Sequence, residues 1–166
     1  MLRPRHMLVT AVTALAIPLP APAQQRTTVE GVWKVVERVT TGANAFTNTS
    51  IQPNLYIFTR GYYSVQRVNG NDARPSLEAF KDAANPTDAE KLGRFTHWNV
   101  FTSNGGTYSL QGTTLTINPI VAKNRSVEGV PQTMEVRVDG NTAWLIQKSA
   151  AGQPASETRT KLTRVE

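Results

Sequence analysis

Residues 132–148 read QTMEVRVDGNTAWLIQK, and this stretch carries the clearest folding signal in the chain. Met134, Val136 and Val138 alternate with polar residues, so an extended strand would place all three on one face. Asp139-Gly140-Asn141 then supplies the residues that tight hairpin turns prefer, and a second apolar run follows directly. The stretch therefore predicts two antiparallel strands joined by a short turn.

The same rhythm of short strands extends in both directions from this hairpin. The predicted strands are 31–39, 54–59, 62–68, 107–111, 114–120, 132–138, 142–148 and 157–165. The first of them also fits a helix face, but its many valines favour a strand. Consecutive antiparallel strands at this spacing predict an all-β fold, an eight-stranded up-and-down antiparallel β-barrel, because closure removes exposed strand edges. An open two-sheet sandwich is the alternative.

One segment breaks the strand pattern and predicts an α-helix near 87–102. Thr87 and Glu90 have the spacing of a capping box, in which each side chain bonds to the other residue's backbone. Leu92, Phe95 and Trp98 follow at helical spacing. The glycines of 104–106 are expected to stop the helix.

The first 23 residues have the pattern of a secretory signal peptide. Arg3 and Arg5 precede an apolar run of about 13 residues, and Ala21-Pro22-Ala23 offers a cleavage site. We expect cleavage near Ala23, which leaves residues 24–166 as one domain that is secreted or periplasmic. An uncleaved membrane anchor is the alternative, although the run is short for a membrane-spanning helix.

Composition narrows the chemistry of the 166 residues. The chain has no cysteine, which excludes disulfides, thiol nucleophiles and thiolate metal sites. The net charge is +6, but lysines and arginines are scattered singly, so nucleic-acid binding is not expected. No second apolar stretch predicts a membrane span. We predict no metal, no cofactor and no catalytic residues, while the oligomeric state stays open.

Aromatic residues are the first candidates for a ligand site. Tyr56 and Phe58 lie two apart and share one face of a strand, and Tyr63, Tyr108 and Trp144 come from other strands. Facing inward, they would line an apolar cavity with a few hydroxyl groups. A filled interior is the alternative, since eight strands leave just enough room for side chains. The opposite face, with Leu55 and Ile57, is an equally possible inner face.

Glu37, Arg137 and His97 are the polar candidates. If Trp33 points inward, regular alternation turns Glu37 inward as well, and a buried carboxylate would have a raised pKa. We place Glu37 and Arg137 in the predicted ligand-binding set. The alternatives for Glu37 are solvent exposure or an ion pair with Arg67 or Arg137. His97 is the one histidine beyond the signal segment, and a structural or surface role is favoured over acid–base catalysis.

Gly31-Val32-Trp33 at the start of the first strand resembles the opening motif of lipocalins and the wider calycins. With Leu55–Thr59, Gly61-Tyr62-Tyr63-Ser64 and Gly106-Thr107-Tyr108, it resembles the bacterial lipocalin-like domain proteins. The resemblance implies an eight-stranded barrel that holds a small apolar molecule. It also implies that Trp33 packs against a basic side chain of the last strand. Arg159, Lys161 and Arg164 are the candidates, and Arg164 is favoured because it lies at the chain end.

These observations lead to three functional hypotheses. The first is an exported barrel that binds a small hydrophobic molecule, including one with a carboxylate, oriented by an inward arginine or tyrosine. The second is a barrel enzyme of the cyclase or isomerase type that holds a flexible apolar substrate. The third is a cell-envelope interaction protein with a filled barrel. A sizeable interior cavity would separate the first two from the third.

Overall fold

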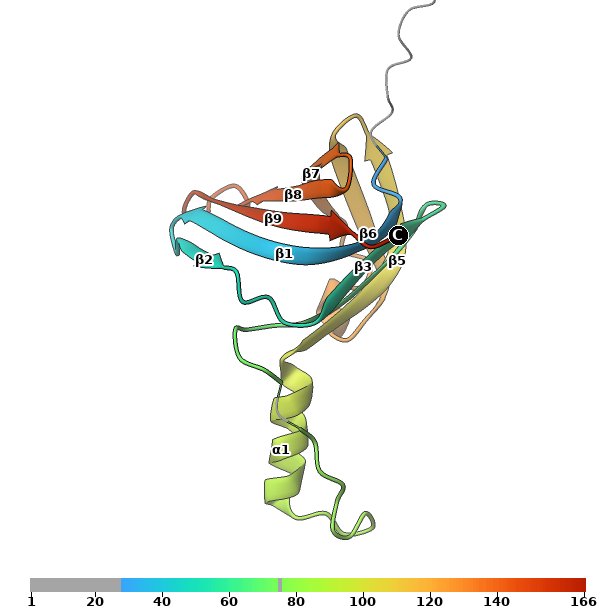
Figure 1. Cartoon of the computed structure of the whole chain (residues 1–166). Coiled ribbons are helices and arrows are strands. Elements are labelled where there is room, and N and C mark those ends of the chain that lie inside the picture. Colours follow the sequence, from blue (N-terminus) through green and yellow to red (C-terminus); the bar gives the residue numbers. More distant parts are fainter. Residues whose placement is uncertain (1–27, 75) are drawn as a thin grey trace, which may run out of the picture.

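The computed structural model describes residues 28–74 and 76–166, which form one twisted antiparallel sheet and a projecting helical arm (Figure 1). The predicted signal peptide and its cleavage site at Ala23 lie outside the described residues. The strands are β1 (Gly31–Gly42), β2 (Phe46–Asn48), β3 (Asn54–Thr59), β4 (Tyr62–Val68), β5 (Phe101–Gln111), β6 (Thr114–Ala122), β7 (Gln132–Asp139), β8 (Thr142–Lys148) and β9 (Ser156–Arg164). The helices are α1 (Asp88–Asn99) and a short 3-10 turn, η1 (Arg125–Val127).

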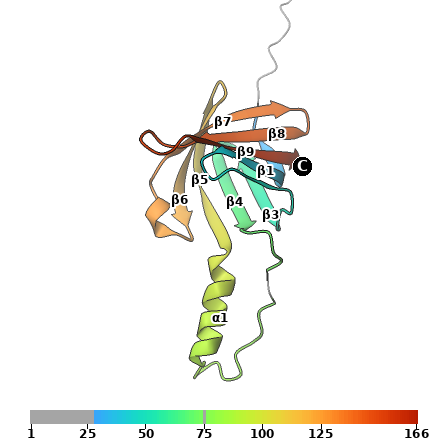
Figure 2. The same ribbon diagram turned by 90° about the vertical axis from the view of Figure 1, so that its left-hand side faces the viewer.

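The sheet closes into a barrel because β1 pairs with β9 as well as with β3. Eight strands, β1 and β3 to β9, complete the circle in chain order, and the short β2 pairs with β1 from outside it. Figure 2 shows β9 beside β1 at this closure. The predicted eight-stranded up-and-down barrel is therefore confirmed, and the sandwich is not formed.

The two ends of the barrel differ. One end, called here the closed end, has the tight turns after β3, β5 and β7 and the start of β1. The other, called here the open end, has the long connections between β1 and β3, β4 and β5, β6 and β7, and β8 and β9. Loops carry most of the variable chemistry of a barrel, so access to the interior is expected at the open end.

Trp33 fills the closed end and is fully buried. Its indole Nε1 donates a hydrogen bond of 2.8 Å to the carbonyl of Val29, and the Arg164 guanidinium lies over its ring at 4.1 Å. Arg164 also donates to the carbonyl of Glu30 at 2.7 Å. A Cβ on Gly31 would come within 2.2 Å of Arg164 Nη1, so the guanidinium occupies the space that the missing side chain leaves. The Trp33–Arg164 pair implied by the resemblance is present.

Helix α1 is present within the predicted 87–102, but it stops earlier and packs differently. The capping box is formed: the amide of Glu90 donates to Thr87 Oγ1 at 3.3 Å, and the amide of Thr87 donates to Glu90 at 2.8 Å. Phe101 already belongs to β5, and the glycines expected to stop the helix lie inside that strand. The reason is tertiary, because β4 needs a partner over its full length and residues 101–107 supply it.

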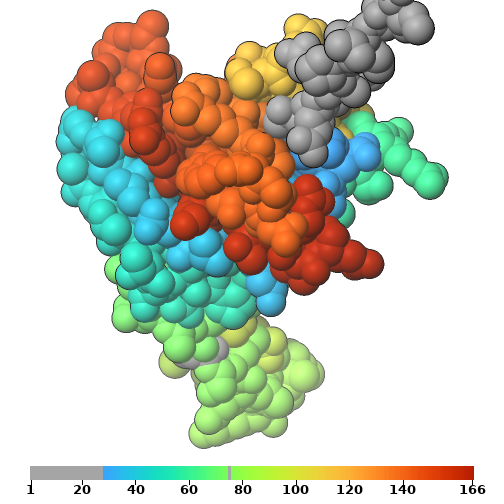
Figure 3. Space-filling model, turned by 45° about the horizontal axis from the view of Figure 1, so that its top comes forward, coloured from blue at the N-terminus to red at the C-terminus, as the bar shows by residue number. Residues whose placement is uncertain are grey.

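The arm formed by α1 projects away from the barrel, as the space-filling view shows (Figure 3). No residue of α1 is buried, and the Phe95 and Trp98 side chains are 63% and 55% exposed. Within the described residues, no helix has the length and apolar character that crossing a membrane requires.

Candidate ligand-binding site inside the barrel

A β-bulge in β1 decides which polar side chains enter the barrel. Against β9, Val35 pairs with Leu162 while Glu37 pairs with Lys161, so Val36 is an extra residue. The side chain of Asn54 supports the strand here, since its Oδ1 accepts from the amide of Val35 at 2.6 Å and its Nδ2 donates to that residue's carbonyl at 3.2 Å.

The bulge reverses the alternation of inward and outward side chains beyond Val35. Trp33 and Val35 face inward, but the next inward side chain is Arg38. Glu37 instead faces outward, in a shallow depression with Trp144 and Lys161. The prediction that Glu37 enters the barrel is therefore wrong, because it assumed an uninterrupted strand.

The barrel interior contains a cavity of about 140 Å³, called here the inner cavity. Its closed-end part is apolar and its open-end part is polar. The apolar lining consists of Tyr56, Phe58, Tyr63, Val65, Leu115, Ile117, Met134 and Leu145. The polar lining consists of Arg38, Arg67, Thr102, Asn104, Gln132, Gln147 and Thr160.

A second cavity of about 160 Å³, called here the outer cavity, lies beside the first under the loop that follows β2. The two cavities share four lining residues, Arg38, Tyr56, Arg67 and Thr160. Each cavity alone is smaller than the roughly 300 Å³ of an ordinary ligand pocket. Neither cavity alone therefore reaches the size that would separate a ligand-binding barrel from a filled one, and the two arginines stand where the cavities meet.

Arg38 and Arg67 are charged side chains in this interior. The Nε atoms of both are buried, and neither finds a hydrogen-bond acceptor among the described residues. Burial lowers the pKa of Arg38, and the positive charge of Arg67 lowers it further, whereas Tyr56 acts in the opposite direction. Both arginines are only partly exposed, so their guanidinium groups give the interior a positive centre.

The predicted aromatic lining is found only in part. Tyr56, Phe58 and Tyr63 line the inner cavity. Tyr108 packs edge-on against Phe58 at 5.3 Å and belongs to the core beneath the cavity. Its hydroxyl donates to Glu30 at the closed end, 3.4 Å away.

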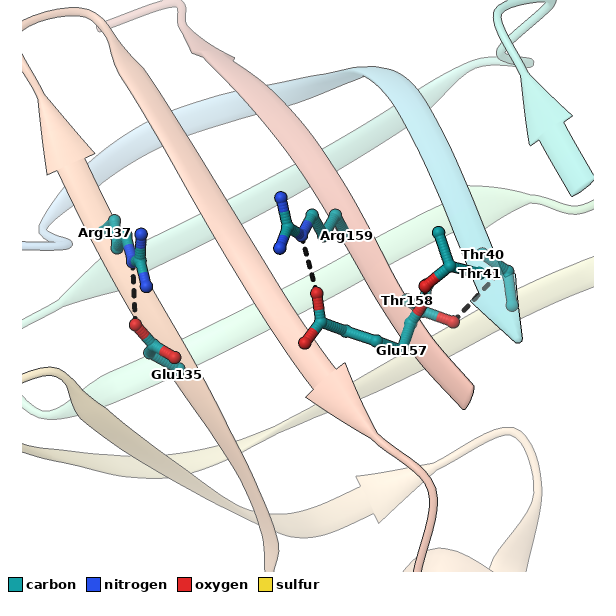
Figure 4. A network of polar contacts seen from close by, with 7 residues as sticks. All are labelled: Thr40, Thr41, Glu135, Arg137, Glu157, Thr158 and Arg159. Atoms are coloured by element: carbon teal, nitrogen blue, oxygen red, sulfur yellow. Dashed lines mark hydrogen bonds and ion pairs between the residues drawn. The ribbon is translucent and has the colours of Figure 1, made fainter. Parts of the chain in front are cut away.

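Trp144 and Arg137 lie on the outer face of the barrel, together with Glu37. Arg137 forms an ion pair of 2.7 Å with Glu135, next to the similar pair of Arg159 with Glu157 (Figure 4). Trp144 shows why the prediction failed, because both neighbours in the sequence, Ala143 and Leu145, are buried in the core. Alternation therefore turns Trp144 outward, and neither it nor Arg137 lines the inner cavity.

His97 is on α1, and its carbonyl accepts a hydrogen bond of 3.3 Å from Arg74. It does not line either of the two interior cavities. No group of side chains suited to holding a metal ion occurs in the described part of the chain. The two residues considered from sequence for acid–base chemistry, Glu37 and His97, are thus both remote from the interior.

Sequence reasoning missed Arg38, Arg67 and Asn104 as site residues. The inward orientation of Arg67 could have been predicted, because Arg67 alternates with Tyr63 and Val65 on β4 and so shares their face. Arg38 was not, since its orientation depends on the bulge. Asn104 was assigned to a helix stop and not to a strand.

Comparisons with known proteins give a similar solved structure but no matching family. No known family matches the sequence, and no curated protein matches it. Among solved structures, the chain is similar to an uncharacterized protein from Bacteroides eggerthii DSM 20697, with a TM-score of 0.43 and 11% sequence identity. The similarity covers 81% of this chain and 98% of that one.

Proposed function

We propose that this protein binds a small amphipathic organic anion inside its barrel. The observation that carries the proposal is the pair of arginines, Arg38 and Arg67, with buried Nε atoms that lack acceptors in the described chain. A carboxylate can accept hydrogen bonds from a guanidinium in a bidentate manner and neutralise its charge. The apolar lining on the closed-end side then receives the carbon skeleton.

This proposal narrows the first sequence-based hypothesis, a small hydrophobic molecule, to one that carries a carboxylate. The polar lining gathers toward the open end, so the anionic head is held there and the apolar part lies deeper. The small cavity volumes favour a compact acid over a long-chain lipid. The resemblance to lipocalin-like proteins supports a binding role, and the predicted signal peptide supports a secreted or periplasmic location for residues 24–166. Both of these remain part of the proposal.

Octanoate and octanol form a matched pair of probes, because they differ only in the charged head group. Isothermal titration calorimetry should show octanoate binding at least about tenfold more tightly than octanol. Arg38→Gln and Arg67→Gln should each weaken octanoate binding about 10- to 100-fold, because each removes a charged hydrogen-bond donor.

Glu37→Gln is the control, since it changes the charge of a residue next to Arg38 that faces outward. It should leave octanoate affinity unchanged. Equal binding of octanol and octanoate, or full affinity in both arginine variants, would show that the arginine pair is not an anion site. Export is tested separately, by sequencing the N-terminus of the protein recovered from its native host.

A further inference from the structure

Buried polar atoms without hydrogen-bond partners gather in the inner cavity. The described residues contain five such side-chain atoms, and four belong to residues that line this cavity: Arg38 Nε, Arg67 Nε, Tyr63 Oη and Asn104 Oδ1. The fifth, Arg94 Nε, is on α1. Folded proteins pair nearly all of their buried polar groups with one another, with water or with a ligand, so this concentration makes the inner cavity the place where a ligand would find polar partners. The arginines account for an anion, which leaves Tyr63 and Asn104 to be explained.

Tyr63 is a hydrogen-bond donor held at a fixed place. The residue is only 4% exposed, and its ring stacks on Phe58 with centroids 6.3 Å apart. Burial raises the pKa of Tyr63 to about 12, so the phenol keeps its proton at neutral pH. A ligand oxygen at this hydroxyl can accept a hydrogen bond from it.

Asn104 supplies an acceptor nearby. On β5 it lies opposite Val65, and Tyr63 is the next inward residue of β4, so the two are diagonal neighbours on one face. Diagonal neighbours are roughly 7–8 Å apart at the backbone, and both residues line the inner cavity. The unpaired atom of Asn104 is its Oδ1, which accepts a hydrogen bond from a ligand donor.

We propose that the ligand carries a hydroxyl group that accepts a hydrogen bond from Tyr63 and donates one to Asn104. This inference rests on the proposed function, because it names the class of that ligand as a hydroxy carboxylic acid. A hydroxyl group both accepts and donates, whereas a carbonyl only accepts and an ammonium group would be repelled by the two arginines.

Strand geometry sets the distance between the two ends of the ligand. Tyr63 and Arg67 are four residues apart on β4, a separation of about 13 Å along the strand, and Asn104 is level with the midpoint. The hydroxyl therefore lies several bonds from the carboxylate. Val65 and the other apolar lining residues contact the carbon chain between them.

The test compares octanoate with a set of hydroxyoctanoates whose hydroxyl occupies successive carbons in the distal half of the chain. With the wild-type protein, calorimetry should show at least one hydroxy acid binding about tenfold more tightly than octanoate. In a cavity without polar partners, the hydroxy acids should instead bind more weakly than octanoate, because burying an unpaired hydroxyl weakens binding. The direction of the affinity difference therefore distinguishes a cavity with polar partners for the hydroxyl from a cavity without them.

Tyr63→Phe and Asn104→Ala should each remove most of this preference, measured as the ratio of hydroxy-acid affinity to octanoate affinity in the same variant. Tyr108→Phe is the matched control, because its hydroxyl bonds to Glu30 at the closed end and it should keep the preference. Tyr63→Phe removes a hydroxyl that has no partner in the described chain, so the variant is expected to fold.

The two proposals fail in different ways. If octanoate binds and depends on Arg38, but no hydroxy acid binds more tightly, the hydroxyl site is wrong and the anion site stands. A preference that persists in both Tyr63→Phe and Asn104→Ala also overturns the hydroxyl site. If no acid in the set binds at all, the proposed function fails, and the hydroxyl site fails with it.

Discussion

Arg38 on β1 and Arg67 on β4 line the same two cavities, although β3 separates their strands. Their Nε atoms are buried without acceptors among the described residues, and the charge of Arg67 contributes to the lowered pKa of Arg38. Two cations held together in a partly dry interior repel each other and lose hydration. The proposed anionic ligand would relieve part of this cost, which would link its binding to stability.

Replacing one arginine should stabilise the free protein while weakening ligand binding. Arg67→Met keeps much of the side-chain volume and removes one partly buried charge, so we expect the free energy of unfolding to rise by about 1 kcal/mol. Urea unfolding without ligand measures this change. Arg137→Met, on the outer face, should change stability by less than about 0.5 kcal/mol. A clear loss of stability in Arg67→Met would mean that the guanidinium has protein partners.

Tyr63 should make the barrel sensitive to alkaline pH. Its pKa is raised from 10.0 to about 12, so between these values the folded protein holds a proton that the unfolded chain has lost. Its contribution to stability is complete below about pH 10 and is lost as the pH rises toward 12. A tenfold change in an acid dissociation constant corresponds to about 1.4 kcal/mol, so the loss of stability should be about 1–3 kcal/mol.

The measurement is the unfolding free energy of wild type minus that of Tyr63→Phe, followed from neutral to strongly alkaline pH. The difference should stay level up to about pH 10 and then fall. Tyr62→Phe serves as the comparison, because Tyr62 is 61% exposed and should give a flat difference. Phenolate absorbance offers a direct check, since the last phenol to titrate in the folded protein should be missing from Tyr63→Phe.

The Trp33–Arg164 pair should stabilise the fold without affecting the ligand. Arg164→Met removes the cation over the indole and the hydrogen bond to Glu30, and we expect it to lower the free energy of unfolding by about 1–3 kcal/mol. Octanoate affinity should be unchanged, because neither residue lines the inner or the outer cavity. A change in affinity with unchanged stability would contradict this structural role.

The arm should unfold independently of the barrel. Thr87→Ala removes the N-cap of α1, a loss of about 1 kcal/mol to the helix. Since α1 has no buried residues, amide hydrogen exchange over 88–99 should accelerate several-fold, while exchange in the barrel strands stays constant. Faster barrel unfolding or faster strand exchange in this variant would show that the arm and the barrel are coupled.

The pH dependence of the arm gives a second check on the cap. Hydrogen bonds from the Lys81 amide and from Thr87 hold the pKa of Glu90 at about 2, below its usual 4.5. This lowered pKa stabilises the capped arm above about pH 4.5, and the contribution disappears as the pH falls toward 2. Exchange over 88–99 in wild type should therefore approach that of Thr87→Ala in acid. The same difference at every pH would exclude the carboxylate from the cap.

Prediction succeeded where the determining interactions are local. Asp139-Gly140-Asn141 marks a turn by itself, and Thr87 with Glu90 marks a helix start, because the interacting groups lie within a few residues. Prediction failed where residues distant in the chain determine the secondary structure or the direction of a side chain. Asn104 is in a strand because β4 lies beside it, and Leu92, Phe95 and Trp98 have helical spacing without a core to cover.

The lining of the inner cavity shows the same division. Tyr56, Phe58 and Tyr63 line it, whereas the sequence left their face and the face of Leu55 and Ile57 as equal alternatives. Arg67 follows from the same uninterrupted alternation as Tyr63. Glu37 faces outward and Arg38 faces inward, the opposite of what regular alternation predicts. The reason is that one extra residue in β1 reverses the orientation of every later side chain in that strand. Nothing in the apolar pattern of β1 marks that residue, since valines occur on both sides of the bulge.

The sequence by itself determined the strand order, the turns and the class of fold, because these follow from two-residue alternation and turn chemistry along neighbouring segments. Only the tertiary structure decided that β1 meets β9, and that this closure contains a bulge supported by Asn54. The position of the bulge turned Arg38 inward beside Arg67. The interior therefore has a positive centre, because pairing between distant strands fixes which side chains share the cavity.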